Sequence, residues 1–167
     1  MAAREPVRRR EAARVLLLDA ADRVLLFHGF DPAEPARTWW FTPGGGLEPG
    51  EDGRTAALRE LAEETGLAGV ELGPVVAVDL AEFSYDGERY EQRQSFHLAR
   101  LPRTPDAPPA ALDSSGSAPD EREQLREARW WTVAELCRTA EQVYPERLAE
   151  LLELLLRQGP PIEPVRL

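Results

Sequence analysis

The sequence predicts one α/β domain in which strands surround a single central helix and further helices follow near the end. With 167 residues, 43% of them hydrophobic, the chain is long enough for one domain with a real core and too short for two comfortable ones, so residues 1–167 are expected to form a single domain. Strand-like runs lie on both sides of a helix-like segment, and turn-forming residues separate them. This mixture favours an α/β or α+β sandwich, and the pattern alone leaves the topology open.

The segments before the helix are predicted to be strands. Two branched-aliphatic runs, Arg14–Leu18 and Val24–Phe27, are separated by a short polar segment and are typical of a β-hairpin. Residues 31–37 contain two prolines and are expected to form a loop that leads to an aromatic strand at 39–42. Pro43 and the three glycines after it end that strand.

The central helix is predicted at 51–65, because this segment has no proline and stops at Gly66, a typical C-terminal cap. Strands follow at 75–85 and 89–101, joined across Asp86-Gly87, which is a strong hairpin signal. Residues 101–123 are rich in proline and serine and are expected to form a mobile loop. A last strand at 126–131 and helices at 133–138 and 145–157 complete the prediction.

Charge and composition exclude several classes of function. The net charge of −10 argues against binding nucleic-acid polymers, because long phosphate backbones are held by basic surfaces. No segment has the roughly 20 apolar residues of a membrane span, so we expect no membrane partner. Cys137 is the single cysteine, and nothing in the chain requires an oxidising compartment. We therefore expect a cytoplasmic protein, monomeric or homodimeric.

Three carboxylates are predicted to share one side of the central helix. At about 100° per residue, Glu60, Glu63 and Glu64 gather opposite a side that contains Leu58 and Leu61, and we expect the glutamates at the exposed surface. Like charges at this spacing cost about 0.2–0.5 kcal/mol per pair. Bound Mg²⁺ would remove that cost, since it prefers oxygen ligands. The alternative interpretation is a solvated acidic face in an acidic protein.

The residues around the helix favour the metal-binding interpretation. The glycine run before it allows a close backbone approach to a ligand, and Arg59 can hold a neighbouring carboxylate through two hydrogen bonds. The run is not a phosphate-binding Walker loop, because that motif requires a lysine and the chain contains none.

The segment 45–67 resembles the Nudix box of the MutT-like hydrolases, Gly-x5-Glu-x7-Arg-Glu-U-x-Glu-Glu-x-Gly-U, where U is aliphatic. Every specified position is filled, as the following residues show: Gly45, Glu51, Arg59, Glu60, Leu61, Glu63, Glu64, Gly66 and Leu67. The resemblance implies an α/β/α sandwich with a mixed β-sheet and hydrolysis of a diphosphate bond in a nucleoside diphosphate derivative.

The resemblance also implies roles for the residues of the box. Glu60, Glu63 and Glu64 correspond to the carboxylates that bind Mg²⁺, with Mn²⁺ as an alternative, and the carbonyl of Gly45 often joins them. Arg59 corresponds to the arginine that orients the carboxylates, and Glu51 to a supporting glutamate. Metal ions then neutralise the diphosphate and help to generate the hydroxide that attacks phosphorus.

Two other functions are compatible with such a fold. One is a nucleotide-sensing or protein-binding module with a vestigial site, which the complete set of carboxylates disfavours. The other is an isopentenyl diphosphate isomerase, which needs a cysteine near the middle of the chain, whereas Cys137 lies in an expected C-terminal helix.

Substrate contacts and the general base are less constrained by the sequence. Trp39 and Trp40 alternate sides of a strand, so we expect one in the core and the other stacked on a base. Tyr85 lies near where dinucleoside-polyphosphate enzymes often carry a tyrosine. Candidates for the base are Glu51 and the acidic residues of the long loop, Asp113, Asp120, Glu121 and Glu123, among which Glu121 and Glu123 are favoured.

Overall fold

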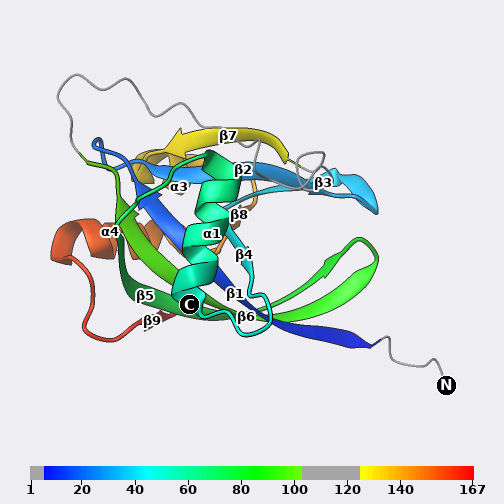
Figure 1. Cartoon of the computed structure of the whole chain (residues 1–167). Helices are drawn as coiled ribbons and strands as arrows, with labels where there is room; N and C mark the ends of the chain where they lie inside the picture. The colour runs from blue at the N-terminus through cyan, green and yellow to red at the C-terminus, as the bar shows by residue number, and fades with distance from the viewer. Residues whose placement is uncertain (1–5, 103–124) are drawn as a thin grey trace.

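The computed structural model describes residues 6–102 and 125–167 of the chain. Its elements, in chain order, are β1 (Val7–Leu18), β2 (Val24–Asp31), β3 (Glu34–Phe41), β4 (Gly44–Gly46), α1 (Gly53–Thr65), β5 (Leu72–Tyr85), β6 (Glu88–Arg100), β7 (Leu125–Trp131), α3 (Val133–Arg138), β8 (Val143–Tyr144), α4 (Leu148–Gln158) and β9 (Val165–Arg166). The described residues form one nine-stranded sheet with helices on both faces (Figure 1). No helix among them is long and apolar enough to cross a membrane.

The sheet is mixed, as the resemblance implied. Its main strand order is β8-β3-β2-β1-β6-β5-β9, with β4 paired to β1 and β7 paired to β2. β1 and β6 run parallel over the whole length of β1, from Val7 opposite Arg89 to Leu18 opposite Arg100. β1 and β2 are paired only where Leu18 faces Val24. Beyond this point the β2-β3 part and the β1-β6-β5 part of the sheet diverge (Figure 1).

Two apolar cores lie on the two faces of the sheet, because successive side chains of a strand point to opposite faces. Val15 and Leu17 of β1 belong to the core under α1, together with Leu61 of that helix. Leu16 and Leu18 belong to the second core, which the leucines of α4 cover on the other face. The α/β/α sandwich expected from the resemblance is confirmed.

The central helix and the long hairpin form close to where the sequence predicts them. Asp52 caps α1 by accepting a hydrogen bond from the Thr55 backbone N–H, and Gly66 ends the helix with a left-handed backbone at φ 72°. Asp86 and Gly87 both have positive φ, which is the geometry of a tight two-residue hairpin turn.

The structure corrects other boundaries. Residues 31–37 are not a loop, because β3 begins at Glu34 and pairs with β2 across an irregularity in register near Phe30. The short strands β4, β8 and β9 are too brief to produce an alternating pattern and were not predicted. The last helix begins at Leu148 and not at 145, because β8 extends to Tyr144 and Arg147 occupies the N-cap position of the helix. The expected loop at 101–123 lies almost entirely outside the described residues.

Candidate active site

A cavity of about 580 Å³ opens between the two diverging parts of the sheet. β1, β5 and β6 form one wall, β2 and β3 form the other, and the turn at 144–147 lies along the rim. The glycine segment at 44–46 crosses from the end of β3 to pair with β1, and α1 contributes Glu60 and Glu64 to the lining. The cavity therefore brings two of the predicted carboxylates, Glu60 and Glu64, together with residues from seven strands.

Glu60 and Glu64 are held against the glycine segment. The Glu64 carboxylate accepts a hydrogen bond of 3.0 Å from the Gly44 backbone N–H. A Cβ atom added to Gly45 would lie 2.5 Å from Glu60 Oε1, so the absence of a side chain at this position allows the carboxylate to pack on the backbone. Glycine in the box thus serves a close approach between backbone and carboxylate.

The expectation that these glutamates lie on an exposed face is wrong for two of them. Glu60 is 8% exposed and Glu64 is 9% exposed, whereas the Glu63 side chain is 37% exposed. The buried arc of α1 includes Ala56 and Ala57 as well as Leu61, which turns the glutamate side toward β1 and β4. Helical spacing indicated that the three glutamates cluster, but not that the strands pack close to them.

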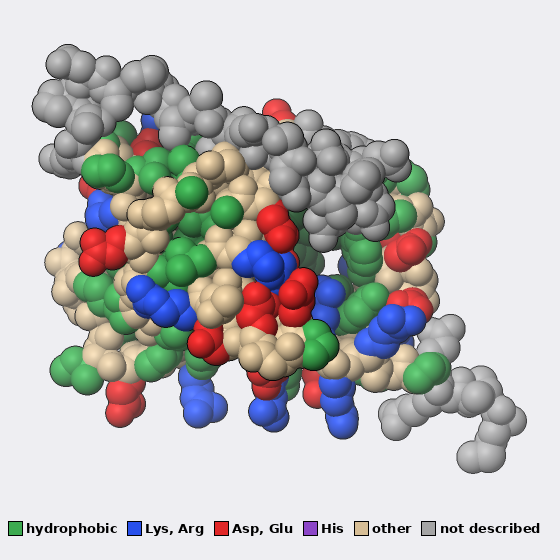
Figure 2. Space-filling model, in the orientation of Figure 1, with side chains coloured by type: hydrophobic (Ala, Val, Ile, Leu, Met, Phe, Trp, Pro, Cys, Tyr) green, Lys and Arg blue, Asp and Glu red, His purple; other side chains and the backbone are tan. Residues whose placement is uncertain are grey.

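Arg59 links the carboxylates of the box. Its Nε and Nη2 donate to the two oxygens of Glu51 at 2.8 and 2.9 Å, and its Nη1 donates to Glu60 at 2.9 Å. The same Nη1 lies 3.4 Å from Glu63, and Nη2 also donates to the Gly46 carbonyl. Figure 2 shows acidic side chains gathered around a basic one beside α1.

The ion pair between Glu51 and Arg59 shifts the pKa values of the two residues in opposite directions. Hydrogen bonds from Arg59 lower the pKa of Glu51 to about 2, and the same bonds raise the pKa of Arg59. A base works best when its pKa lies near the working pH. The geometry therefore favours Glu51 as the residue that positions Arg59 and disfavours it as the general base.

Two arginines that the sequence analysis did not single out lie on the cavity side of β1. Arg14 donates to the carbonyls of Thr42 and Gly44, which fixes the segment that leads to the box. Burial lowers the pKa of Arg14, and the nearby Glu64 opposes that effect. Arg10 lies four residues earlier on the same side of the strand. Alternating positions of a strand point to the same face, so Arg10 and Arg14 could have been assigned to one side from the sequence. That assignment requires a strand that begins at Val7, whereas the sequence analysis began it at Arg14.

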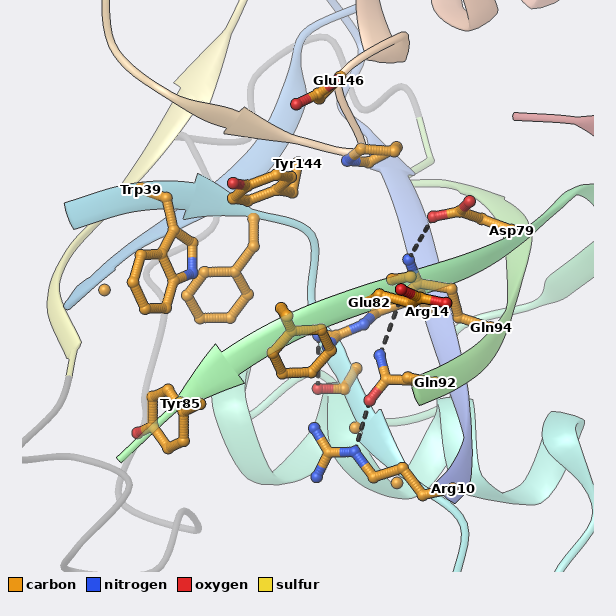
Figure 3. A pocket seen from close by; sticks show the side chains of 18 of the residues that line it. Arg10, Arg14, Trp39, Asp79, Glu82, Tyr85, Gln92, Gln94, Tyr144 and Glu146 are labelled. Atoms are coloured by element: carbon orange, nitrogen blue, oxygen red, sulfur yellow. Dashed lines mark hydrogen bonds between the residues drawn. The ribbon is translucent and has the colours of Figure 1, made fainter. Parts of the chain in front are cut away.

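The aromatic side chains divide between cavity and core. Trp39 and Tyr85 line the cavity with ring centroids 6.3 Å apart (Figure 3). Burial is the main cause that raises the pKa of Tyr85 to about 12, and nearby acidic groups add to the effect. Trp40 is 1% exposed and packs between His28 and Trp131. Trp40 is therefore not a substrate contact. The sequence analysis expected one of the two tryptophans to lie in the core, and that residue is Trp40.

The donor set suits a hard divalent cation. Its oxygens come from carboxylates and from the glycine backbone, and such ligands suit Mg²⁺ or Mn²⁺. In the part of the chain that the structure describes, no group of three or more acidic, histidine or cysteine side chains already converges on one point. Arg59 lies between Glu60 and Glu63 in this arrangement. Glu63 thus needs a side-chain rotation to join the other two.

The loop candidates for the general base, Asp113, Asp120, Glu121 and Glu123, lie outside the described residues. Among the described candidates only Glu51 remains from the sequence analysis, with the low pKa described above.

Comparisons with known proteins agree with the fold and the motif. The NUDIX domain model matches residues 8–155. An RNA pyrophosphohydrolase of Sphingopyxis alaskensis is 31% identical over 138 residues, which cover 76% of this chain and 80% of that protein. An RNA pyrophosphohydrolase of Dinoroseobacter shibae is 48% identical over 77 residues, but the match spans only 46% of each chain.

Solved structures show the same fold at low identity. A MutT protein from Methanosarcina mazei superposes with a TM-score of 0.61 at 15% identity, covering 92% of this chain and 96% of that one. An Ap4A hydrolase from C. elegans gives a TM-score of 0.58 at 17% identity, covering 89% and 98%. The chain therefore belongs to the Nudix family of hydrolases, and its fold is that of the MutT-like members.

Proposed function

We propose that this protein hydrolyses a phosphoanhydride bond in a nucleoside diphosphate derivative, by attack of water at phosphorus in the presence of Mg²⁺. The observation that carries the proposal is the pairing of Glu60 and Glu64 with the glycine segment at the base of the cavity. The complete box, with Arg59 tied to Glu51 and Glu60, supports catalysis over a vestigial sensing site. Cys137 is exposed and does not line the cavity, which also disfavours the isomerase alternative.

Each residue of the box has a distinct task in this proposal. Glu60, Glu63 and Glu64, with the Gly45 carbonyl, would hold the cation, which supplies charge neutralisation and lowers the pKa of water when bound. Arg59 keeps Glu60 in place, and Glu51 keeps Arg59 in place, so the Glu60 carboxylate needs little reorganisation when substrate enters. Trp39 and Tyr85 offer aromatic surfaces for a base at the other end of the cavity.

Glutamine substitutions test the carboxylates. Glu63→Gln and Glu64→Gln should lower turnover by about two orders of magnitude or more, and calorimetry should show weaker Mg²⁺ binding with unchanged far-UV circular dichroism. Glu71→Gln is the matched control, because Glu71 is exposed and lies just beyond α1. Near wild-type Mg²⁺-dependent turnover in both site variants would contradict the assignment of Glu63 and Glu64 as metal ligands.

Labelled water tests the bond that is broken. Hydrolysis in ¹⁸O-water should place the label on a phosphate product. Label found only in a product without phosphorus would refute attack at phosphorus.

A second candidate is removal of pyrophosphate from an RNA end, favoured by the relatives named RNA pyrophosphohydrolase. Only the terminal nucleotide needs to enter the cavity, so the net charge of −10 opposes extended polymer contacts without excluding this substrate. A product-identified panel decides between the candidates: nucleoside triphosphates, oxidised nucleotides, dinucleoside polyphosphates, ADP-ribose, nucleotide sugars and a 5′-triphosphate RNA oligonucleotide.

A further inference from the structure

The wall of the cavity opposite Trp39 carries a continuous row of hydrogen-bonded polar side chains (Figure 3). Arg10 Nε donates to Gln92 Oε1 at 2.5 Å, Gln92 Nε2 donates to Gln94 Oε1 at 2.9 Å, and Gln94 Nε2 donates to Asp79 Oδ2 at 2.9 Å. We call these four residues, from strands β1, β6 and β5, the polar row. Nothing in the Nudix box specifies them.

We infer that Arg10 binds a phosphate group of the substrate in addition to the two phosphates whose bond is cleaved, and that Gln92, Gln94 and Asp79 position it for this contact. The inference rests on the proposed function and adds a substrate class to it, namely nucleotides with three or more phosphates.

The direction of the polar row is fixed by its ends. A guanidinium only donates hydrogen bonds, and an ionised carboxylate only accepts them. Because Arg10 stands at one end and Asp79 at the other, each glutamine amide has a single orientation that satisfies both neighbours. Gln92 is 1% exposed, so a flipped amide there would leave a buried polar group unsatisfied. The row therefore holds Arg10 by its Nε edge.

The other edge of Arg10 remains available to a ligand. The guanidinium lies over the rings of Tyr90 and Phe83, at 5.0 and 5.9 Å from their centroids, so its plane packs on aromatic carbon. Within the described residues, no protein oxygen accepts a hydrogen bond from its Nη1 or Nη2. These amino groups form the forked donor that matches the oxygens of a phosphate.

The lining of the cavity places this donor near the proposed reaction centre. Arg10 and Arg14 of β1 line the same cavity as Glu60 and Glu64 of α1. Positively and negatively charged side chains therefore lie together in this cavity. Arg14 already donates to two backbone carbonyls, whereas in the part of the chain that the structure describes the Arg10 side chain donates one hydrogen bond, to Gln92. Arg10 is consequently placed to neutralise a phosphate that the cation on the carboxylates does not reach.

The test uses three variants that separate charge from shape. Arg10→Gln removes the charge. Gln92→Glu keeps an acceptor for Arg10 but neutralises the charge of Arg10 with a neighbouring carboxylate. Arg10→Lys keeps the positive charge but loses the two amino groups of the guanidinium. Arg9→Gln is the matched control, because Arg9 is adjacent on β1, points to the opposite face and pairs with Glu91 at 3.1 Å with its side chain 78% exposed.

Binding is measured by calorimetry with Mg²⁺ and methylene-bridged, non-hydrolysable analogues of a nucleoside diphosphate and of a nucleoside triphosphate. Arg10→Gln and Gln92→Glu should weaken binding of the triphosphate analogue about tenfold or more, with the diphosphate analogue much less affected and the melting temperature retained. Arg10→Lys should fall between wild type and Arg10→Gln, and Arg9→Gln should match wild type.

Steady-state kinetics give a second readout on the same proteins. We expect the loss in kcat/KM for a nucleoside triphosphate to exceed the loss for ADP-ribose. Equal losses on the two analogues, or none, would overturn the role of Arg10 even if the enzyme hydrolyses anhydrides as proposed. If no anhydride is hydrolysed but the binding difference persists, the proposed function fails and the phosphate contact stands.

Discussion

The Cα atom of Gly45 lies so close to the carboxylate of Glu60 that a Cβ atom at this position would be 2.5 Å from Oε1 and 2.7 Å from the carboxyl carbon. The neighbouring Gly46 differs sharply, because a Cβ atom there would meet only the Glu11 carbonyl, at 3.8 Å. The two glycines therefore form a natural pair for testing whether the position of Glu60 matters.

We predict that Gly45→Ala lowers kcat/KM by about 100-fold, because the added methyl group displaces the Glu60 carboxylate. The displaced atoms are the end of a flexible side chain, so the melting temperature should change little. Gly46→Ala should retain activity within about threefold, because a methyl group at this position would make no close contact. A threefold loss is well below the tenfold change that corresponds to about 1.4 kcal/mol. Similar activity of the two variants would contradict the role assigned to Glu60.

The Glu51–Arg59 ion pair should give the protein a pH-dependent part of its stability. The pKa of Glu51 falls from its ordinary 4.5 to about 2 in the folded protein. A depressed carboxyl pKa contributes stability that is fully present above about pH 4.5 and is lost as the pH falls through about 2. Melting temperatures of wild type and Glu51→Gln, measured from pH 6 to pH 2, should therefore converge in this window. Parallel curves would show that the pair adds no such dependence.

The helix cap offers a prediction about α1 alone. Asp52 accepts a 2.7 Å hydrogen bond from the Thr55 backbone N–H, and this bond also lowers the pKa of Asp52. Asp52→Ala should lower the free energy of unfolding by about 1 kcal/mol. Asp52→Asn should lose much less, because asparagine can also accept from that N–H. Urea denaturation at pH 7 measures both, and equal losses would argue against capping as the cause.

The adjacent tryptophans should respond in opposite ways to truncation. Trp40→Ala should destabilise the protein by about 3–5 kcal/mol, because it removes a fully buried ring from between His28 and Trp131. Trp39→Ala should change stability far less and raise KM for nucleotides, because its ring faces the cavity. Denaturation and steady-state kinetics on both variants check the assignment. If KM rose in Trp40→Ala and not in Trp39→Ala, the assignment of Trp39 to the cavity and Trp40 to the core would be wrong.

The sequence predicted the elements that have a strong local pattern. The helix that ends at Gly66, the turn at Asp86-Gly87 and the helix at 133–138 all lie close to their predicted positions. The three glutamates could be assigned to one side of α1 from helical spacing. Their burial could not be predicted, because it depends on the crossing of the glycine segment from β3 to β1, which is a long-range feature.

The polar row shows a different limit of sequence analysis. Arg10 and Gln92 are 82 residues apart and meet because β1 and β6 run parallel, with Arg10 opposite Gln92 in register. Parallel pairing between strands distant in sequence leaves no local signal, and polar residues on a strand face are equally typical of a solvated surface. Asp79 enters the row only through the pairing of β5 with β6.

The single pairing of Leu18 with Val24 has a consequence for how this enzyme can diversify. Because the two walls of the cavity share almost no backbone ladder, residues such as Trp39 on one wall and Gln94 on the other lie in separately paired parts of the sheet and can change size independently. Such changes leave the ladders of both walls and the glycine crossing intact. The architecture thus separates the residues that select a substrate from those that break its bond, and new specificities can arise without rebuilding the catalytic helix.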